Sequence, residues 1–240
     1  MLHRLPLLRQ ITLRHAVPVG RSIRPTDREG RARRLLNVAV AAVGLVLALP
    51  LMLVIAALIK LTSRGPVLFK QTRIGLDRRA LSRAGGNTRR QIDCGGASFT
   101  MYKFRTMYLD RHDHARQAWA KPEDDRVTPV GRVLRRFRLD ELPQLINVLK
   151  GEMNVVGPRP EQPAIFVYLR ERLEGYQRRQ RVRPGITGSA QIRQGYDTSI
   201  EDVRRKLRYD LDYLGRQSPV EDLKIMARTI PVMAFQQGAW

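Results

Sequence analysis

The longest apolar stretch of the chain covers residues 35–59 and contains no charged side chain. As a straight helix at about 1.5 Å per residue, these 25 residues would extend roughly 37 Å, more than the hydrocarbon core of a bilayer. A helix that is apolar on every side over such a length is typical of a membrane segment and not of a soluble core. The pattern therefore predicts a membrane helix over residues 35–59.

Two features of this segment bear on its path through the membrane. Pro50 lies inside it, and proline kinks a helix because it removes one backbone hydrogen bond. Basic residues flank both ends, in residues 31–34 and 60–73, and the positive-inside rule places both flanks in the cytoplasm. A re-entrant helix that breaks at Pro50 and returns to its own side satisfies the rule. A kinked single span with basic residues on both sides is the alternative.

The polar and apolar pattern of the remaining chain predicts short strands and helices. Residues 67–69, 99–105 and 153–156 read as strands. Residues 130–137 and 142–149 each repeat apolar side chains at the i, i+3, i+4, i+7 spacing of one helix face. The sequence therefore predicts two consecutive short helices between the second and third strands.

The C-terminal third combines basic, turn-forming and helical segments. Residues 170–183 contain six arginines and are interpreted as an exposed basic stripe, and residues 184–188 as a turn-rich loop. Ser199, three residues before an aspartate, predicts a helix cap. Ser218, followed by proline and then by a glutamate at the third position, predicts a capping box. Two C-terminal helices are expected.

These patterns divide the chain into three parts. Residues 1–34 form a basic N-terminal segment, residues 35–59 the membrane helix, and residues 60–240 a further domain in which residues 78–98 are interpreted as an inserted loop. The N-terminal segment holds nine arginines and only two acids. This composition fits either a transit peptide or a segment that lies on anionic lipid.

Composition narrows the classes of protein that the chain can belong to. The 44 lysines and arginines against 22 acids give a formal charge of +22, which implies an anionic partner: nucleic acid, anionic membrane or phosphorylated substrate. A single cysteine excludes an internal disulfide and a cysteine-based metal site within one chain. Residues 84–96 are rich in glycine but lack the Gly-x-x-x-x-Gly-Lys-Ser/Thr pattern of a phosphate-binding loop. This disfavours an ATPase that binds its nucleotide through such a loop.

Adjacent acids at residues 140 and 141 are the first candidates for chemistry. Acids at a helix start are ordinarily caps, and this reading stays open for Asp140 and Glu141. However, four arginines lie within residues 132–138, and Arg159 follows between two prolines. Arginine makes bidentate contacts with phosphate, and a helix N-terminus also binds phosphate. Acids, arginines and a helix start together suit phosphoryl transfer.

Six motifs occur in an order that resembles the bacterial sugar transferase family. These enzymes are the monotopic polyprenyl-phosphate phosphoglycosyl transferases that start capsule, exopolysaccharide or O-antigen assembly. The similarity runs from about residue 33 to about residue 230. The motifs lie at residues 65–75, 103–107, 139–144, 147–151, 156–160 and 183–188, the last followed by Gln191.

The resemblance implies a two-step reaction. Asp140 would attack the β-phosphate of a UDP-sugar, release UMP and hold the sugar phosphate, with Glu141 as its partner acid. Undecaprenyl phosphate would then accept the hexose-1-phosphate. Covalent catalysis of this kind divides one difficult step into two easier ones. The transferred sugar cannot be read from the sequence.

The resemblance also implies a set of binding residues. Asp140 and Glu141 would hold Mg²⁺, which suits carboxylate and phosphate oxygens. Substrate or phosphate binding is expected of five further residues: Lys103, Arg105, Arg135, Arg159 and Gln191. Arg138 departs from the family pattern, because many members have a small polar residue at this position.

The fold implied by the resemblance is α/β. It consists of a re-entrant membrane helix, membrane-surface helices and a small mixed α/β catalytic domain on the cytoplasmic side of the bacterial inner membrane. Anionic lipid is an expected partner, and a homo-oligomer is left open.

Two alternatives to an enzyme are a membrane-tethered nucleic-acid binder and an inactive partner subunit. Aromatic residues make up 6% of the chain and are not interleaved with the basic stripe, so nucleic acid is not an expected partner. The presence of both Asp140 and Glu141 argues against an inactive subunit.

Overall fold

The computed structural model describes residues 30–77, 95–109, 124–195 and 199–234. The basic N-terminal segment, apart from its last residues, and most of the predicted inserted loop lie outside the described residues. Ser98, the last residue of that predicted loop, is instead the first residue of a strand.

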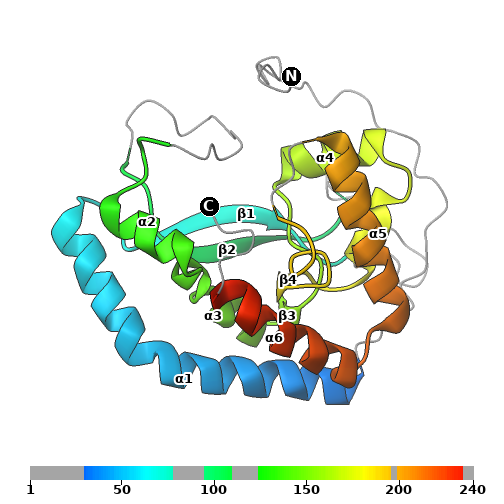
Figure 1. Cartoon of the computed structure of the whole chain (residues 1–240), viewed down its shortest axis with the longest axis horizontal. Coiled ribbons are helices and arrows are strands. Elements are labelled where there is room, and N and C mark those ends of the chain that lie inside the picture. The colour runs from blue at the N-terminus through cyan, green and yellow to red at the C-terminus, as the bar shows by residue number, and fades with distance from the viewer. Residues whose placement is uncertain (1–29, 78–94, 110–123, 196–198, 235–240) are drawn as a thin grey trace.

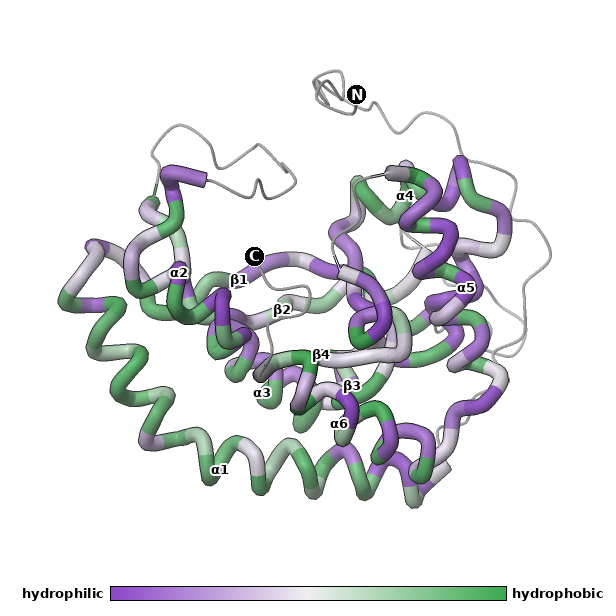
Figure 2. Tube along the Cα trace, viewed as in Figure 1, coloured by the Kyte–Doolittle hydropathy of each residue, from purple (hydrophilic) through white to green (hydrophobic). Residues whose placement is uncertain are grey.

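The apolar stretch forms one long helix, α1 (Arg31–Thr62), which extends beyond both predicted ends and contains Pro50. Within the described part of the chain, α1 is the one helix that is long and apolar enough to cross a membrane. Figure 1 shows α1 running along the lower edge of the molecule and then turning upward along its left side. Figure 2 shows that most of this helix is hydrophobic. The expectation of a long apolar helix is confirmed.

The other helices surround a small amount of sheet (Figure 1). Both helices expected between residues 130 and 149 are present, although the second begins only at Gln144. The elements are α2 (Pro129–Arg136), the 3-10 turn η2 (Leu139–Glu141), α3 (Gln144–Leu149), α4 (Pro163–Arg172), the 3-10 turn η3 (Tyr176–Arg181), α5 (Ile200–Arg216) and α6 (Pro219–Ala234).

The strands form two separate pairs. Strands β1 (Leu68–Ile74) and β2 (Ser98–Phe104) are antiparallel over their whole length, whereas β3 (Asn154–Val156) and β4 (Gly185–Thr187) are parallel. The mixed α/β class is confirmed. The interpretation of residues 184–188 as a loop is wrong, since this segment contains β4.

Close backbone packing explains why β4 reads as a loop. A Cβ atom on Gly185 would lie 2.0 Å from the backbone nitrogen of Gly157, so only glycine fits at this contact. Gly185, which suggests a turn in the sequence, is therefore needed because the backbones of β4 and of the segment after β3 lie so close together.

Ser199 and Ser218, the two serines expected to cap the C-terminal helices, each accept a hydrogen bond from the backbone of the helix that follows. At the start of α5, Ser199 and Asp202 form a reciprocal capping box. At the start of α6, the Ser218 hydroxyl accepts a hydrogen bond of 3.1 Å from the backbone of Glu221. These caps satisfy backbone N–H groups that have no partner within a helix.

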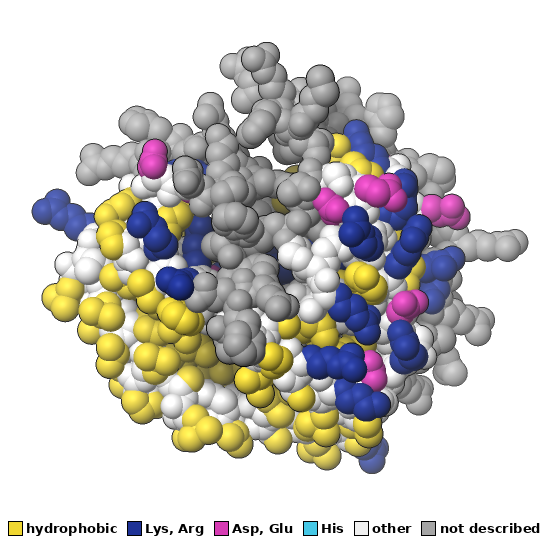
Figure 3. All heavy atoms as spheres, in the orientation of Figure 1, with side chains coloured by type: hydrophobic (Ala, Val, Ile, Leu, Met, Phe, Trp, Pro, Cys, Tyr) yellow, Lys and Arg dark blue, Asp and Glu magenta, His cyan; other side chains and the backbone are white. Residues whose placement is uncertain are grey.

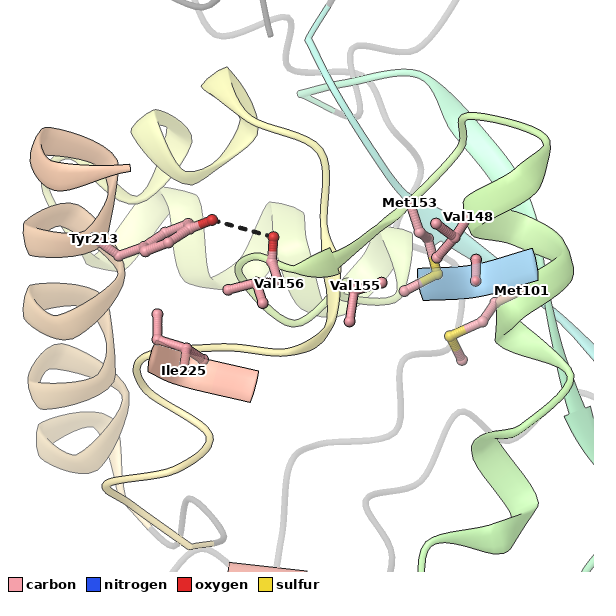
Figure 4. Close-up of a cluster of buried hydrophobic side chains, with 8 residues drawn as sticks. Met101, Val148, Met153, Val155, Val156, Tyr213 and Ile225 are labelled. Atoms are coloured by element: carbon pink, nitrogen blue, oxygen red, sulfur yellow. Dashed lines mark hydrogen bonds between the residues drawn. The ribbon is translucent and has the colours of Figure 1, made fainter. Parts of the chain in front are cut away.

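The largest buried cluster lies around β3, where strands and helices meet. The Tyr213 hydroxyl donates to the carbonyl oxygen of Val156 across this cluster, at 3.2 Å. Ala41 of α1 belongs to the same cluster, so α1 packs against the core of the domain. Figure 4 labels the other buried members, which are Met101, Val148, Met153, Val155 and Ile225.

Both ends of α1 are attached to this domain. Near its N-terminus, Arg33 forms a buried ion pair with Asp222 of α6 at 2.7 Å. At its C-terminus, the Arg105 guanidinium donates to the carbonyl oxygen of Ser63 at 2.8 Å. Between these attachments, most of the large apolar side chains in residues 43–54 are exposed. Figure 3 shows hydrophobic surface along the same lower and left edges.

The expected basic stripe over residues 170–183 is only partly present. Arg172 and Arg178 are exposed, as predicted, but Arg179 is buried, so the interpretation is wrong for this side chain. Arg179 Nε lies 2.7 Å from Asp210 of α5 and its Nη1 lies 3.5 Å from Glu161. These two carboxylates come from elsewhere in the chain and balance the buried charge.

Replacing Asp222 with alanine is expected to lower the thermal stability of the protein strongly. The Arg33 charge would stay buried without its carboxylate, and breaking such a pair typically costs about 3–5 kcal/mol. Thermal unfolding in detergent measures the loss. The control is Glu201→Ala, which breaks the exposed pair with Arg204 and should change stability by less than about 1 kcal/mol. Equal melting temperatures for the two variants would contradict the prediction.

Candidate active site

Asp140 and Glu141 lie in the short turn η2, between α2 and α3. Both side chains are largely buried, with exposed fractions of 8% and 6% for the two residues. The acids were expected at or near the N-terminus of the second helix, and the structure places them just before it. Pro143 precedes the first residue of α3, and a proline lacks the N–H that would continue a helix from the preceding turn.

Two cations from other elements contact this acid pair. Lys103 of β2 places its Nζ 2.8 Å from Glu141 Oε1 and 3.7 Å from Asp140 Oδ2. Arg159, in the loop after β3, places its Nη2 2.9 Å from the same Glu141 oxygen. Side chains from β2 and from the loop that contains Arg159 thus meet at Glu141 of η2. Glu141 is firmly held, whereas Asp140 has only the longer contact with Lys103 among the described residues.

The electrostatics differ between the two acids. Burial raises the pKa of Asp140 above its ordinary value, and the charge of Lys103 only partly opposes this. Burial alone would also raise the pKa of Glu141, but the charges and hydrogen bonds of Arg159 and Lys103 hold it well below its usual range. Glu141 is therefore a permanent anion that fixes the two cations, and Asp140 is the acid left available for a ligand.

The structure brings three of the five expected binding residues to this pair. Lys103 and Arg159 contact it directly, and the positive charge of Arg135 acts on Asp140 while its Nε donates to Thr106 Oγ1 at 3.0 Å. Gln191 does not contact the acids in any described hydrogen bond, but it lines a cavity that Glu141 also lines.

Arg105 is the expected binding residue that the structure places elsewhere. Its side chain is buried, and its guanidinium donates to the backbone at the end of α1, with contacts to the oxygens of Ser63 and Arg64. Burial lowers its pKa. In this arrangement Arg105 caps the C-terminal carbonyls of α1, where a cation is favourable.

Two arginines that hold the backbone on either side of Arg159, the buried Arg179 and the half-buried Arg73, were not singled out from the sequence. Arg179 donates to the carbonyl oxygen of Arg159 at 3.1 Å while it pairs with Asp210. Arg73 donates to the carbonyl oxygen of Pro160 at 3.0 Å, and burial lowers its pKa to about 10. Both sides of the loop are therefore held. The only sequence signal was an unusual density of arginines, which does not show which one is buried.

The acid pair consists of the kind of oxygen donor that magnesium ions prefer. No group of three or more His, Cys, Asp or Glu side chains occurs within the described ranges, so a metal cage made only of protein ligands is absent there. Mg²⁺ does not require such a cage, because it commonly takes one or two carboxylates and fills its other positions with water and substrate phosphate. Asp140 and Glu141 fit this donor set, and a bound cation would offset the burial of Asp140.

Comparison with known proteins shows which family the chain is similar to. A family profile described as bacterial sugar transferase matches residues 28–236. A Caulobacter vibrioides protein, UDP-glucose:undecaprenyl-phosphate glucose-1-phosphate transferase, is 42% identical over 210 residues, covering 87% of this chain and 72% of the relative.

Two other relatives are longer than this chain. UDP-N-acetylgalactosamine-undecaprenyl-phosphate N-acetylgalactosaminephosphotransferase of Aeromonas hydrophila is 38% identical over 91% of this chain and 47% of the relative. UDP-glucose:undecaprenyl-phosphate glucose-1-phosphate transferase of Escherichia coli (strain K12) is 38% identical over 82% of this chain and 39% of the relative. The chain thus spans less than half of either protein.

Proposed function

The chain belongs to the bacterial sugar transferase family, and from this membership we propose that it transfers a hexose-1-phosphate from a UDP-sugar to undecaprenyl phosphate. The activities in the names of its relatives support this proposal. The reaction would be the first membrane step of exopolysaccharide, capsule or O-antigen assembly. The observation that carries the proposal is the buried pair of Asp140 and Glu141 with Lys103 and Arg159 around it.

In the first step, an oxygen of Asp140 attacks the β-phosphorus of the UDP-sugar. A bond forms between this oxygen and the phosphorus, and the bond from the phosphorus to the oxygen bridging the α-phosphate breaks. UMP leaves with that oxygen, and the sugar phosphate stays on the aspartate. Asp140 suits this role because its carboxylate has only a 3.7 Å contact with Lys103, whereas Glu141 is held by two shorter contacts.

In the second step, a phosphate oxygen of undecaprenyl phosphate attacks the same phosphorus. The new bond completes a lipid diphosphate sugar, and the bond to Asp140 breaks, which restores the carboxylate. Lys103 and Arg159 are placed to stabilise the negative charge on the transferred group in both steps. Fixed charges of this kind need no rearrangement when the reaction occurs.

The proposed reaction would use a magnesium ion. Asp140 and Glu141 would hold the ion, which supplies positive charge to the phosphate oxygens of the donor. The positive charge of Arg135 acts on Asp140 and would add to that of the ion.

The attachment of α1 supports a re-entrant path in the membrane. Arg33 near one end and Ser63 at the other both contact the same domain, and the exposed apolar side chains lie between them. A straight helix that crossed the bilayer would carry its ends to opposite sides. We therefore propose that both ends of α1 and the catalytic domain lie on the cytoplasmic side of the bacterial inner membrane, in contact with anionic lipid.

The proposed reaction can be tested by its nucleotide product. The purified protein in nanodiscs would be incubated with Mg²⁺, undecaprenyl phosphate and each of several UDP-sugars. Release of UMP from one donor is expected and also names the sugar. Release of UDP would mean ordinary glycosyl transfer and would overturn the proposal. No product from any donor would support an inactive partner subunit.

Arg179→Gln is expected to reduce turnover by about 10²-fold with a smaller effect on the KM for UDP-sugar. The variant removes the contact with the Arg159 carbonyl, so the guanidinium of Arg159 loses its fixed position. Steady-state kinetics with UMP release measures the change. Arg178→Gln, at an exposed neighbouring position, is the control and should behave like the original chain.

Partial rescue by Arg179→Lys would distinguish positioning from a general loss of folding, which thermal unfolding of each variant also checks. Unchanged turnover in a folded Arg179→Gln variant would contradict the proposal that Arg179 positions Arg159.

A further inference from the structure

A cavity of about 120 Å³ lies beside the acid pair, and the proposed chemistry does not account for it. Glu141 and Arg138 line it together with Gln191. The rest of its wall is mainly apolar and comes from the end of η2, from α3, from the segment around β4 and from the last turns of α6. These apolar side chains are Leu142, Leu145, Ile186, Ile192, Val232 and Met233.

The polar groups of this cavity indicate what kind of ligand it could bind. The hydroxyls of Thr187 and Thr229 bond to each other at 2.8 Å, and Gln191 Nε2 donates to the carbonyl oxygen of Ile186 at 3.0 Å. In contrast, no hydrogen bond or ion pair links the Arg138 guanidinium to any of the described residues. Gln191 Oε1 is buried and likewise has no partner there. A half-buried guanidinium with no partner in the described part of the chain is suited to bind an anion.

The backbone at Arg138 points to the same conclusion. Its φ of 54° is the one positive value of a non-glycine residue in the part of the chain that the structure describes. A residue with a Cβ atom adopts this conformation at a cost, and such strain concentrates at functional sites. The strained arginine stands two residues before Asp140.

The cavity also adjoins the apolar part of α1. A Cβ atom on Gly44, near the middle of α1, would lie 3.5 Å from Leu145 Cδ1, and Leu145 lines the cavity. The side chains of Val43, Val46 and Leu47, close to Gly44 in α1, are exposed and apolar. A ligand that filled the cavity would therefore have an anion partner at one end and the hydrophobic surface of α1 at the other.

We propose that this cavity binds the first isoprene unit of the acceptor lipid, next to its phosphate, and that Arg138 pairs with that phosphate. The proposal rests on the function proposed above and assigns a place to its second substrate. An apolar cavity of about 150 Å³ holds one benzene ring, so about 120 Å³ suits a five-carbon isoprene unit. The remaining isoprene units would follow α1 into the membrane.

The uracil ring of the donor is the competing occupant. A pyrimidine base presents several donors and acceptors at its edge, and each needs a partner when it is buried. Besides Arg138, this cavity offers Gln191 Oε1 as its unpartnered buried side-chain atom among the described residues. An apolar chain with one anionic end matches the lining better.

Val232→Phe tests the cavity by filling it from the last turn of α6. The KM for undecaprenyl phosphate is expected to rise about ten-fold or more, since pocket contacts of this size change specificity by 10-fold to 200-fold. The KM for UDP-sugar, and the UMP released when no acceptor lipid is present, should stay close to those of the original chain. The control is Leu223→Phe, which adds the same ring at an exposed position of α6 outside the cavity.

Arg138→Asn tests the phosphate contact separately. Asparagine tolerates the left-handed backbone but carries no charge, so the acceptor KM should rise, and Arg138→Lys should restore part of the affinity. An unchanged acceptor KM in both Val232→Phe and Arg138→Asn would overturn the proposal. A rise in the KM for UDP-sugar instead would assign the cavity to the nucleotide. Failure of the unmutated chain to release UMP from any donor would refute the proposed function itself, and is a different result.

Discussion

Asp140→Asn is expected to abolish phosphosugar transfer, with a loss of at least about 10⁴-fold in turnover, which is the scale on which removal of a covalent nucleophile acts. Asparagine keeps the size of the side chain and its place in η2 but has no anionic oxygen to attack phosphorus. Because the variant cannot form the bond to the β-phosphate, even the step that precedes acceptor binding should fail. UMP release from the donor alone, in a single turnover, measures this directly.

Two variants serve as controls for this result. Asp212→Asn changes an exposed acid of α5 and should leave turnover unaffected. Glu141→Gln removes the anion that holds Lys103 and Arg159, so it should reduce turnover while leaving Asp140 able to react. If Asp140→Asn released UMP at the rate of the original chain, the covalent role of Asp140 would be wrong.

Removal of magnesium is the second change with a large expected effect. Treatment with EDTA should reduce UMP release to background. Three cations lie near Asp140 and Glu141, and without a metal ion they would have to balance both carboxylates and the negative charges of the donor. Addition of excess Mg²⁺ should restore the rate. Measuring the melting temperature at each Mg²⁺ concentration separates binding of the ion from catalysis. An ion that binds the folded chain raises this temperature even if no reaction takes place.

Full activity in EDTA would show that the arginines and lysine are sufficient without a metal. In that case the assignment of Asp140 and Glu141 as magnesium ligands would fail, while the covalent role of Asp140 could still stand.

Local signals in the sequence predicted much of the fold. The apolar run of α1, the face of α2 and the caps at Ser199 and Ser218 are each determined by neighbours within a few residues, so their patterns can be read directly. The short strand β4 was missed for the opposite reason. Its glycine serves a contact with Gly157, which is distant in sequence.

The candidate site depends on contacts that no local pattern contains. The residues alone indicated phosphate chemistry at Asp140 and Glu141, and only the family resemblance pointed to Lys103, which lies far upstream. Arg105 and Arg179 show the limit most clearly, because a list of arginines cannot tell a phosphate ligand from a helix cap or a buried ion pair. The partners that decide between these roles, Ser63 and Asp210, are also far away in sequence.

The fate of the β-phosphorus of the donor tests the central claim most directly. The protein in nanodiscs would be given undecaprenyl phosphate, Mg²⁺ and a UDP-sugar labelled at that atom, and the products would be separated into lipid and nucleotide. The account predicts that the label enters the lipid and that the nucleotide product is unlabelled UMP. Label recovered in UDP, with an unlabelled lipid, would contradict it.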